Sequence, residues 1–123
     1  MAYTNSQQCI TLEAGVDLSA KQYFFMSVSS DGQIDPCGDG ATAVGVLQND
    51  PAAAGRAAEV CINGVTKVSA GGTIAAGAEV ASDASGEAVA AATGDVILGI
   101  ALQAATDGDI ISMVFSPRDK KSA

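Results

Sequence analysis

Histidine and tryptophan are both absent from this 123-residue chain, and aromatic residues make up only 4% of it. Without histidine, Ser-His-Asp and Cys-His catalytic arrangements and imidazole metal sites are excluded. A carboxylate pair for glycoside chemistry needs an apolar or aromatic pocket that separates the two pKa values, and few residues here could build one. We therefore expect no enzyme activity, no catalytic residues and no cofactor.

Basic residues are scarce as well. The chain has 6 Lys and Arg against 14 Asp and Glu, which gives a net charge of −8. This balance excludes electrostatic attraction to nucleic acid or to an anionic membrane. Arg118, Lys120 and Lys121 all fall in the last six residues. We interpret residues 118–123 as a solvated basic tail rather than a phosphate-binding arm.

The three cysteines, Cys9, Cys37 and Cys61, are widely spaced and form no Cys-x-x-Cys motif. A zinc site would need all three thiolates and a carboxylate, so we expect buried or incidental thiols and no metal site. The aspartates in residues 31–39 and 107–109 lack the spacing of a calcium loop and are interpreted as solvated turn residues.

Long apolar runs are missing too. The best, residues 96–102, is far shorter than the roughly 18 residues of a membrane span. Residues 1–8 have no basic residue and precede no apolar run, so we expect no signal peptide and synthesis in a cytosol-like compartment. Of the residues, 24 are alanine, which buries little surface. The core is therefore predicted to be thin and supported from outside, by copies of the chain or by a larger surface.

What the chain does contain is a series of short apolar segments separated by turn signals. Asp31-Gly32, Asn63-Gly64 and the Asp83 to Gly86 stretch each predict a hairpin turn, since their residues accept positive φ or bond their own backbone. The pattern predicts an all-β fold, a small antiparallel barrel or sandwich of short strands with little helix. We expect one β domain over residues 9–117, preceded by a flexible arm of residues 1–8.

An internal repeat appears when the chain is shifted by 54 residues. Without a gap, the shift aligns Gly32 with Gly86, Gly45 with Gly99, and Val60 with Val114. This favours two pseudo-repeated halves. It also predicts two matching exposed tips, at residues 31–32 and 83–86.

Two predicted strands, residues 96–102 and 110–115, are largely apolar in both alternating sets of side chains. A strand with one solvated face should instead alternate with polar residues. Either these strands are central in a closed barrel, or another subunit covers one face. Because the core is thin, we favour a homo-oligomer, with four candidate interface residues: Ile97, Ile111, Met113 and Phe115.

Over about residues 10–115, the spacing of small and aliphatic residues resembles that of a known protein family. The carrying motifs are Gly45-Val46, Ala53-Ala54-Gly55, Glu59-Val60, Gly64-Val65, Ala70-Gly71, Ala76-Gly77, Val80-x-x-Asp83-x-x-Gly86, Val96-x-x-Gly99-Ile100-Ala101 and Gly108-Asp109-Ile110-Ile111-x-x-Val114. In these the chain resembles the small capsid cement, or head decoration, proteins of tailed bacteriophages.

The resemblance implies a structural protein that binds the outer surface of an expanded icosahedral phage head and bridges major capsid protein subunits. It also implies a virion protein, made in the host cytoplasm, that often forms a homotrimer and has no catalytic residues to carry over. The alternative is a carbohydrate-binding or adhesive β-domain, for which the chain offers few aromatic platforms.

Within that reading we expect the N-terminal arm and the strand after it to order on the capsid and add backbone hydrogen bonds to it. Many copies on a lattice would then act together through multivalency. The candidate capsid-contact residues are Tyr3, Thr4, Asn5, Gln7, Gln8, Ile10 and Leu12.

Overall fold

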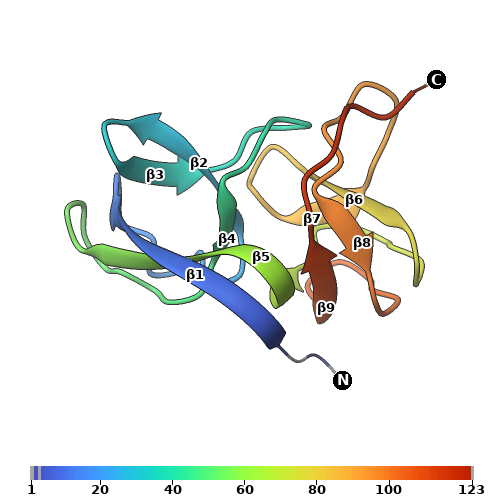
Figure 1. Cartoon of the computed structure of the whole chain (residues 1–123), viewed down its shortest axis with the longest axis horizontal. Helices are drawn as coiled ribbons and strands as arrows, with labels where there is room; N and C mark the ends of the chain where they lie inside the picture. The colour runs from blue at the N-terminus through green and yellow to red at the C-terminus, as the bar shows by residue number, and fades with distance from the viewer. Residues whose placement is uncertain (1, 3, 123) are drawn as a thin grey trace.

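The computed structural model describes residue 2 and residues 4–122, and in this part the chain forms nine strands and no helix. Their bounds are β1 Asn5–Ala14, β2 Phe25–Ser30, β3 Gln33–Pro36, β4 Gly45–Leu47, β5 Ala57–Ser69, β6 Glu79–Ser82, β7 Ala88–Ala90, β8 Gly99–Ala101 and β9 Ile110–Phe115. The described residues thus include no helix that could cross a membrane. The all-β prediction is confirmed (Figure 1).

The first five strands close into a ring. In the single sheet of order β1-β3-β2-β4-β5-β9-β8-β6-β7, β1 pairs both with β3 and with β5, so the first five strands return to their start. The interior of this ring is filled by aliphatic side chains and one methionine: Ala14, Leu18, Met26, Ile34, Leu47, Ala58 and Val60. Of the two predicted architectures, the first half is therefore a small barrel.

The remaining strands repeat this arrangement on the other side of β5, in the right half of Figure 1. β5 pairs with β9, β9 with β8, β8 with β6, and β6 with β7. A parallel bridge between Ala70, just after β5, and Ala88 in β7 joins the ends of the series. It corresponds to the parallel pair of Ala14 with Ile34 in the first half.

The register of pairing shows the duplication directly. In the first half, Met26 of β2 pairs with Pro36 and with Gly45. The residues 54 positions later pair in the same way: Val80 of β6 pairs with Ala90 and with Gly99. Because register depends on every residue between the paired positions, this agreement establishes the two related halves.

The repeat also explains an unusual backbone conformation at Tyr23. Its φ is +69°, in the region that favours glycine, and the residue 54 positions on is Gly77, with a φ of +84°. Both N–H groups donate to equivalent carbonyls, those of Leu47 and Ala101, at 2.7 and 2.8 Å. The contacts of the Tyr23 side chain offset the cost of this conformation, because the ring packs on the core and lies 5.8 Å from the Lys67 ammonium.

The hairpin predicted at Asn63-Gly64 is wrong. β5 continues through both residues and carries the chain from the first half to the second. Gly64 has a φ of +102°, and a Cβ at this position would collide with the backbone oxygen of Ser6 in β1. The glycine therefore bends β5 where β1 crosses it closely, instead of reversing the chain.

The tip at residues 83–86 differs from its prediction in one respect. Asp83 bonds its own turn, accepting from the N–H groups of Ser85 and Glu87 at 2.9 Å, as expected. Gly86 is buried, however, and its oxygen accepts the Phe25 N–H at 2.7 Å, whereas Gly32 is exposed. The two tips thus have different surroundings, although the strands that they join have the same register.

A second core joins the halves. Phe25, Cys37, Ala43 and Val46 of the first half pack with residues of β5 to β9, and the rings of Phe25 and Phe115 lie 6.2 Å apart. All four residues predicted for an oligomer interface are already covered within the protomer, with exposures of 7% or less: Ile97, Ile111, Met113 and Phe115. Internal packing therefore accounts for the apolar pattern that suggested a second subunit.

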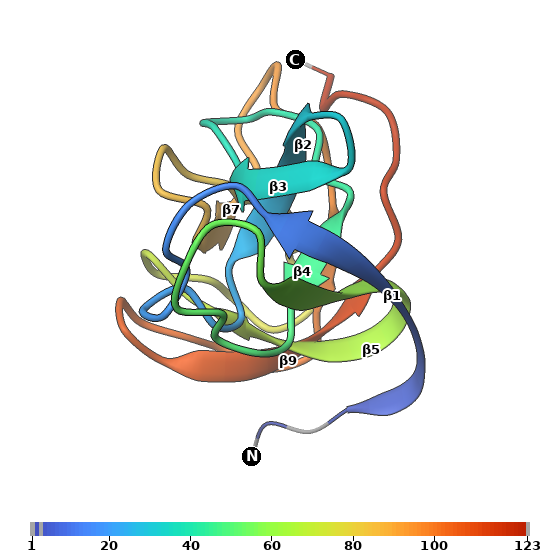
Figure 2. The same cartoon turned by 90° about the vertical axis from the view of Figure 1, so that its left-hand side faces the viewer.

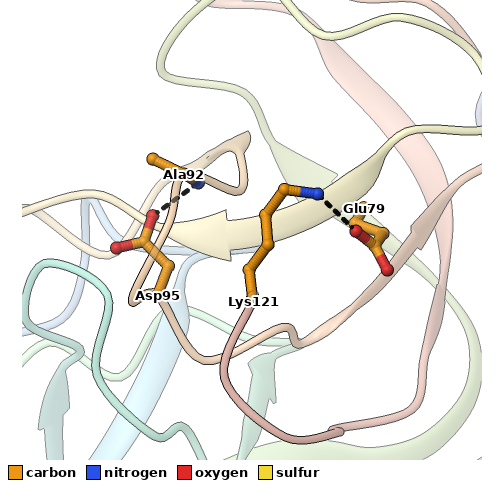
Figure 3. A network of polar contacts seen from close by, with 4 residues as sticks. All are labelled: Glu79, Ala92, Asp95 and Lys121. Carbon is orange, nitrogen blue, oxygen red and sulfur yellow. Dashed lines mark hydrogen bonds and ion pairs between the residues drawn. The ribbon is translucent and has the colours of Figure 1, made fainter. Parts of the chain in front are cut away.

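Described residues of the predicted arm and of the predicted tail lie along other segments of the fold. Within the expected arm, Asn5 and Gln8 belong to β1 and pair with Val65 and Asn63. The basic tail runs back along residues 94–97, and Val96 forms a bridge with Lys120. The ammonium of Lys121 lies 2.7 Å from the Glu79 carboxylate (Figure 3).

Close approach of β8 to β9 at Gly99 gives a first prediction. A Cβ there would collide with the Val114 carbonyl oxygen and lie 2.6 Å from the Met113 side chain, so Gly99→Ala should lower the free energy of unfolding by about 2 kcal/mol. Gly72→Ala is the matched control, because its Cβ would find its nearest neighbour, Val89 Cγ1, at 3.6 Å. Urea unfolding of both variants checks this. Equal losses would contradict the packing described for β8.

The docked tail gives a second prediction. Ending the chain after Pro117 removes four backbone hydrogen bonds between residues 118–121 and residues 94–97. We expect a loss of about 2 kcal/mol in the free energy of unfolding. Lys121→Met breaks only the half-exposed ion pair with Glu79 and should cost less than about 1 kcal/mol. Urea unfolding measures both, and a truncated chain as stable as the full one would show that the tail contributes nothing.

Candidate functional site: the free edge of β1

β1 is paired along one edge only for most of its length. Its residues from Asn5 to Glu13 pair with β5, whereas β3 joins the opposite edge only at Glu13 and Ala14. Figure 2 shows the N-terminal part of β1 at the lower border of the molecule, away from β2 and β3. Among the described residues, no strand covers this second edge of β1 before Glu13.

Two hydrogen bonds reveal which backbone groups face the free edge. The Ala14 N–H donates towards β5, to the Arg56 oxygen at 2.9 Å, and the Glu13 N–H donates to the opposite side, to the Gly32 oxygen at 3.1 Å. Backbone groups alternate in direction along a strand, and the register from Cys9 to Glu13 is uninterrupted. The N–H and C=O groups of Thr11 and Cys9 therefore point to the free edge. An extended chain could pair with them.

The side chains of β1 are mostly accessible. Of the predicted capsid-contact residues, four are exposed: Thr4, Asn5, Gln8 and Ile10, the last at 38%. Two are half-buried, because Gln7 bonds the Gln48 side chain at 2.9 Å and Leu12 packs on the barrel core. Tyr3 lies outside the described residues. The structure therefore places the described members of this set on or beside one strand.

The edge is regular only in part. The register shifts between Asn5 and Gln8 and again between Gln8 and Cys9, and Ser6 has a φ of +48°. Such irregularities bend an edge strand and limit uncontrolled pairing with other chains. The segment able to pair is thus short, from Cys9 to Leu12.

Acidic side chains stand beside this segment. A shallow hollow next to it is lined by Thr11, Leu12, Glu13, Asp31, Gly32, Gly55 and Ala57. Two of these residues, Glu13 and Asp31, are carboxylates that no basic residue of the hollow neutralises. A partner segment that carries positive charge would therefore be favoured here.

Sequence reasoning missed one feature of β1. Cys9 lies opposite Cys61 of β5, although the two are far apart in the chain. Partial burial raises the pKa of the Cys9 thiol, and the Cys61 thiol and the Glu59 carboxylate raise it further. Only the register of β1 on β5 reveals this pair. For metals, no cluster of three or more His, Cys, Asp or Glu placed to hold an ion occurs in the part of the chain that the structure describes.

Comparison with known proteins extends these observations. A family model described as phage cement protein matches residues 4–114. The structure is also similar to that of the head fiber gp8.5 N base in bacteriophage phi29, with a TM-score of 0.73 and 20% identity, covering 94% of this chain and 100% of that one. At this identity the similarity shows a shared fold. No curated protein matches the chain.

Proposed function

The chain belongs to the phage cement protein family, and we propose that it stabilises the phage head by pairing the free edge of β1 with an extended segment of a major capsid protein subunit. Membership of the family gives the chain a structural, capsid-associated role in the virion. The proposal concerns how it binds: on the outer surface of the expanded head, where each copy bridges neighbouring subunits.

One observation carries the proposal: the backbone groups of Cys9 and Thr11 are unpaired on the edge of β1 that faces away from β5. Adding a strand to an edge gives affinity through main-chain hydrogen bonds and needs few specific side chains. That suits this surface, where the hollow beside β1 is shallow and the exposed large apolar residues are scattered over several segments.

Charge supports the same mode of binding. The net charge of −8 opposes non-specific association between molecules in solution, and the carboxylates of Glu13 and Asp31 flank the pairing segment. A basic or neutral capsid segment would be attracted to this edge, whereas the edge of a second acidic copy would be repelled. Premature pairing between copies is thereby disfavoured.

Many copies on one head would act together. A short strand pairing is weak by itself, but a copy that contacts two subunits gains from the high effective concentration of the second contact. We include in the proposal the trimeric state that the family resemblance implies. Sedimentation equilibrium of the free protein tests it, because a trimer has three times the 12.1 kDa mass of the chain; a monomer at the concentrations that saturate heads would refute this part.

Blocking the edge should weaken binding to heads. Thr11→Pro removes the N–H that faces the free edge and leaves the hydrogen bonds of β1 to β5 in place, since the Thr11 N–H does not point to β5. We expect cosedimentation with empty expanded heads to weaken at least tenfold. Thr11→Ala keeps the N–H and is the matched control, with binding close to that of the parent chain.

The comparison separates loss of pairing from loss of folding. Circular dichroism and thermal unfolding of both variants must show that β1 remains folded before head binding is interpreted. Undiminished occupancy by a folded Thr11→Pro protein would refute pairing at this edge. Equal loss in both variants would instead indicate that the Thr11 side chain is what the capsid contacts.

The side chains beside the edge give a further prediction. Ile10 in β1 and Leu102 after β8 are both 38% exposed, so Ile10→Asp and Leu102→Asp remove similar amounts of exposed apolar surface. If the capsid contacts the edge of β1, Ile10→Asp should weaken head binding several-fold and Leu102→Asp should not. Head cosedimentation over a range of protein concentrations measures this. The reverse order would place the contact surface on the second half.

A further inference from the structure

Cys9 and Cys61 are a cross-strand pair of a particular kind. The hydrogen bond from the Ala14 N–H to the Arg56 oxygen marks that pair as hydrogen-bonded, and such pairs alternate along antiparallel strands. Counting along the uninterrupted register, Cys9 and Cys61 form a non-hydrogen-bonded pair. In these pairs the Cα atoms lie about 4.5 Å apart with both side chains on one face, within the range of about 4.4–6.8 Å that a disulfide spans.

The two thiols differ in access in a way that suits stepwise oxidation. Cys9 is exposed, whereas Cys61 is buried and its Sγ lies 3.2 Å from the Asn63 oxygen. An external reagent can therefore reach Cys9 first, and Cys61 can follow from within the fold. Cys37, the third thiol, is buried in the other core and bonds the carbonyls of its own loop.

We propose that Cys9 and Cys61 form a disulfide that fastens the edge strand β1 to β5 after the protein leaves the reducing host cytoplasm. Virion surfaces are among the oxidising environments in which disulfides form and persist. Formation of the bond depends on the register alone. Its consequence for binding rests on the proposed function, because β1 is the strand that would be paired with the capsid.

The chemistry balances with a small-molecule disulfide as the oxidant. The Cys9 thiolate attacks one sulfur of the external disulfide, whose other sulfur leaves as a thiolate and takes up a proton. Cys61 then loses its proton and attacks the Cys9 sulfur of the mixed disulfide, releasing the second external thiol. Two protein thiols are oxidised, and one external disulfide is reduced to two thiols.

Fastening matters because few side chains of β1 are buried. Of its ten residues only Ala14 is buried, so β1 is held mainly by its backbone pairing with β5. A disulfide closes the loop from Cys9 to Cys61 and restricts the unfolded chain. We expect the oxidised protein to unfold at a temperature higher by about 5–10 °C than the reduced protein.

The first test uses the full-length chain, reduced, freed of reductant and incubated with oxidised glutathione. We expect a mass lower by two hydrogen atoms, one remaining thiol, and a peptide in which Cys9 is joined to Cys61. Cys9→Ser should abolish the bond. Cys37→Ser is the matched control and should retain it. Three persisting thiols, a stable glutathione adduct on Cys9, a bond to Cys37, or covalent dimers would each overturn the proposal.

The rate of this reaction supplies an independent check. Only the thiolate attacks, and the raised pKa of Cys9 keeps most of it protonated at neutral pH. Below that pKa, oxidation should therefore accelerate roughly tenfold for each unit of pH. A rate that does not change between neutral and alkaline pH would contradict initiation at Cys9.

A second test separates the disulfide from its role on the capsid. Oxidised and reduced protein, bound to empty expanded heads, are challenged with increasing urea. We expect the oxidised protein to remain bound at higher urea, and Cys9→Ser to behave like the reduced protein under both conditions. Release at the same urea concentration would overturn the fastening role. A disulfide that forms in a protein unable to bind heads would refute the proposed function and leave the bond itself established.

Discussion

The bend of β5 at Gly64 is the constraint on which the two halves depend. β5 pairs with β4 and with most of β1 before the bend, and with β9 from Gly64 onward, so one strand belongs to both rings. The bend needs a positive φ and a residue without a Cβ, because β1 passes directly over it at Ser6. Since the halves share a strand and the core around Phe25 and Phe115, neither is complete alone. The molecule should therefore unfold as one cooperative unit.

Local chemistry predicted much of this fold. The Asp83 turn forms through the backbone bonds expected of aspartate, and Ile110 to Phe115 form a strand with the predicted bounds. The repeat offset read from three aligned residue pairs reappears as a shared pairing register. These features depend on residues close in the chain or on repeated spacing, and both can be read from sequence.

What the local sequence left undecided depends on long-range contacts. Asn63-Gly64 has the same local signature whether a strand reverses or bends, and the passage of β1 over Gly64 decides between them. An apolar strand such as β9 looks alike whether another subunit or another part of the protomer covers it; here the outer face of β2, at Phe25, is the cover. The N-terminal segment was predicted to contact the capsid, and it includes the strand whose second edge the structure leaves unpaired. Which edge of β1 stays free, and which thiol faces Cys9, depends on its register with β5.

Equivalent strand pairs of the two halves differ in what covers them. In the first half, Phe25 and Val46 form a fully buried pair beneath the second half. The equivalent pair in the second half is Glu79 and Ile100, and there a charge replaces the aromatic ring. Lys121 of the docked tail neutralises that charge.

A polar terminal face is what stops an array of repeats from adding another unit. The second half therefore ends the series with Glu79 and the tail. At the N-terminal side of the fold, no strand among the described residues pairs with the second edge of β1 before Glu13, so the backbone groups of Cys9 and Thr11 are left open. The duplicated fold thus leaves one unpaired strand edge, and an extended capsid segment is the partner that we propose for it.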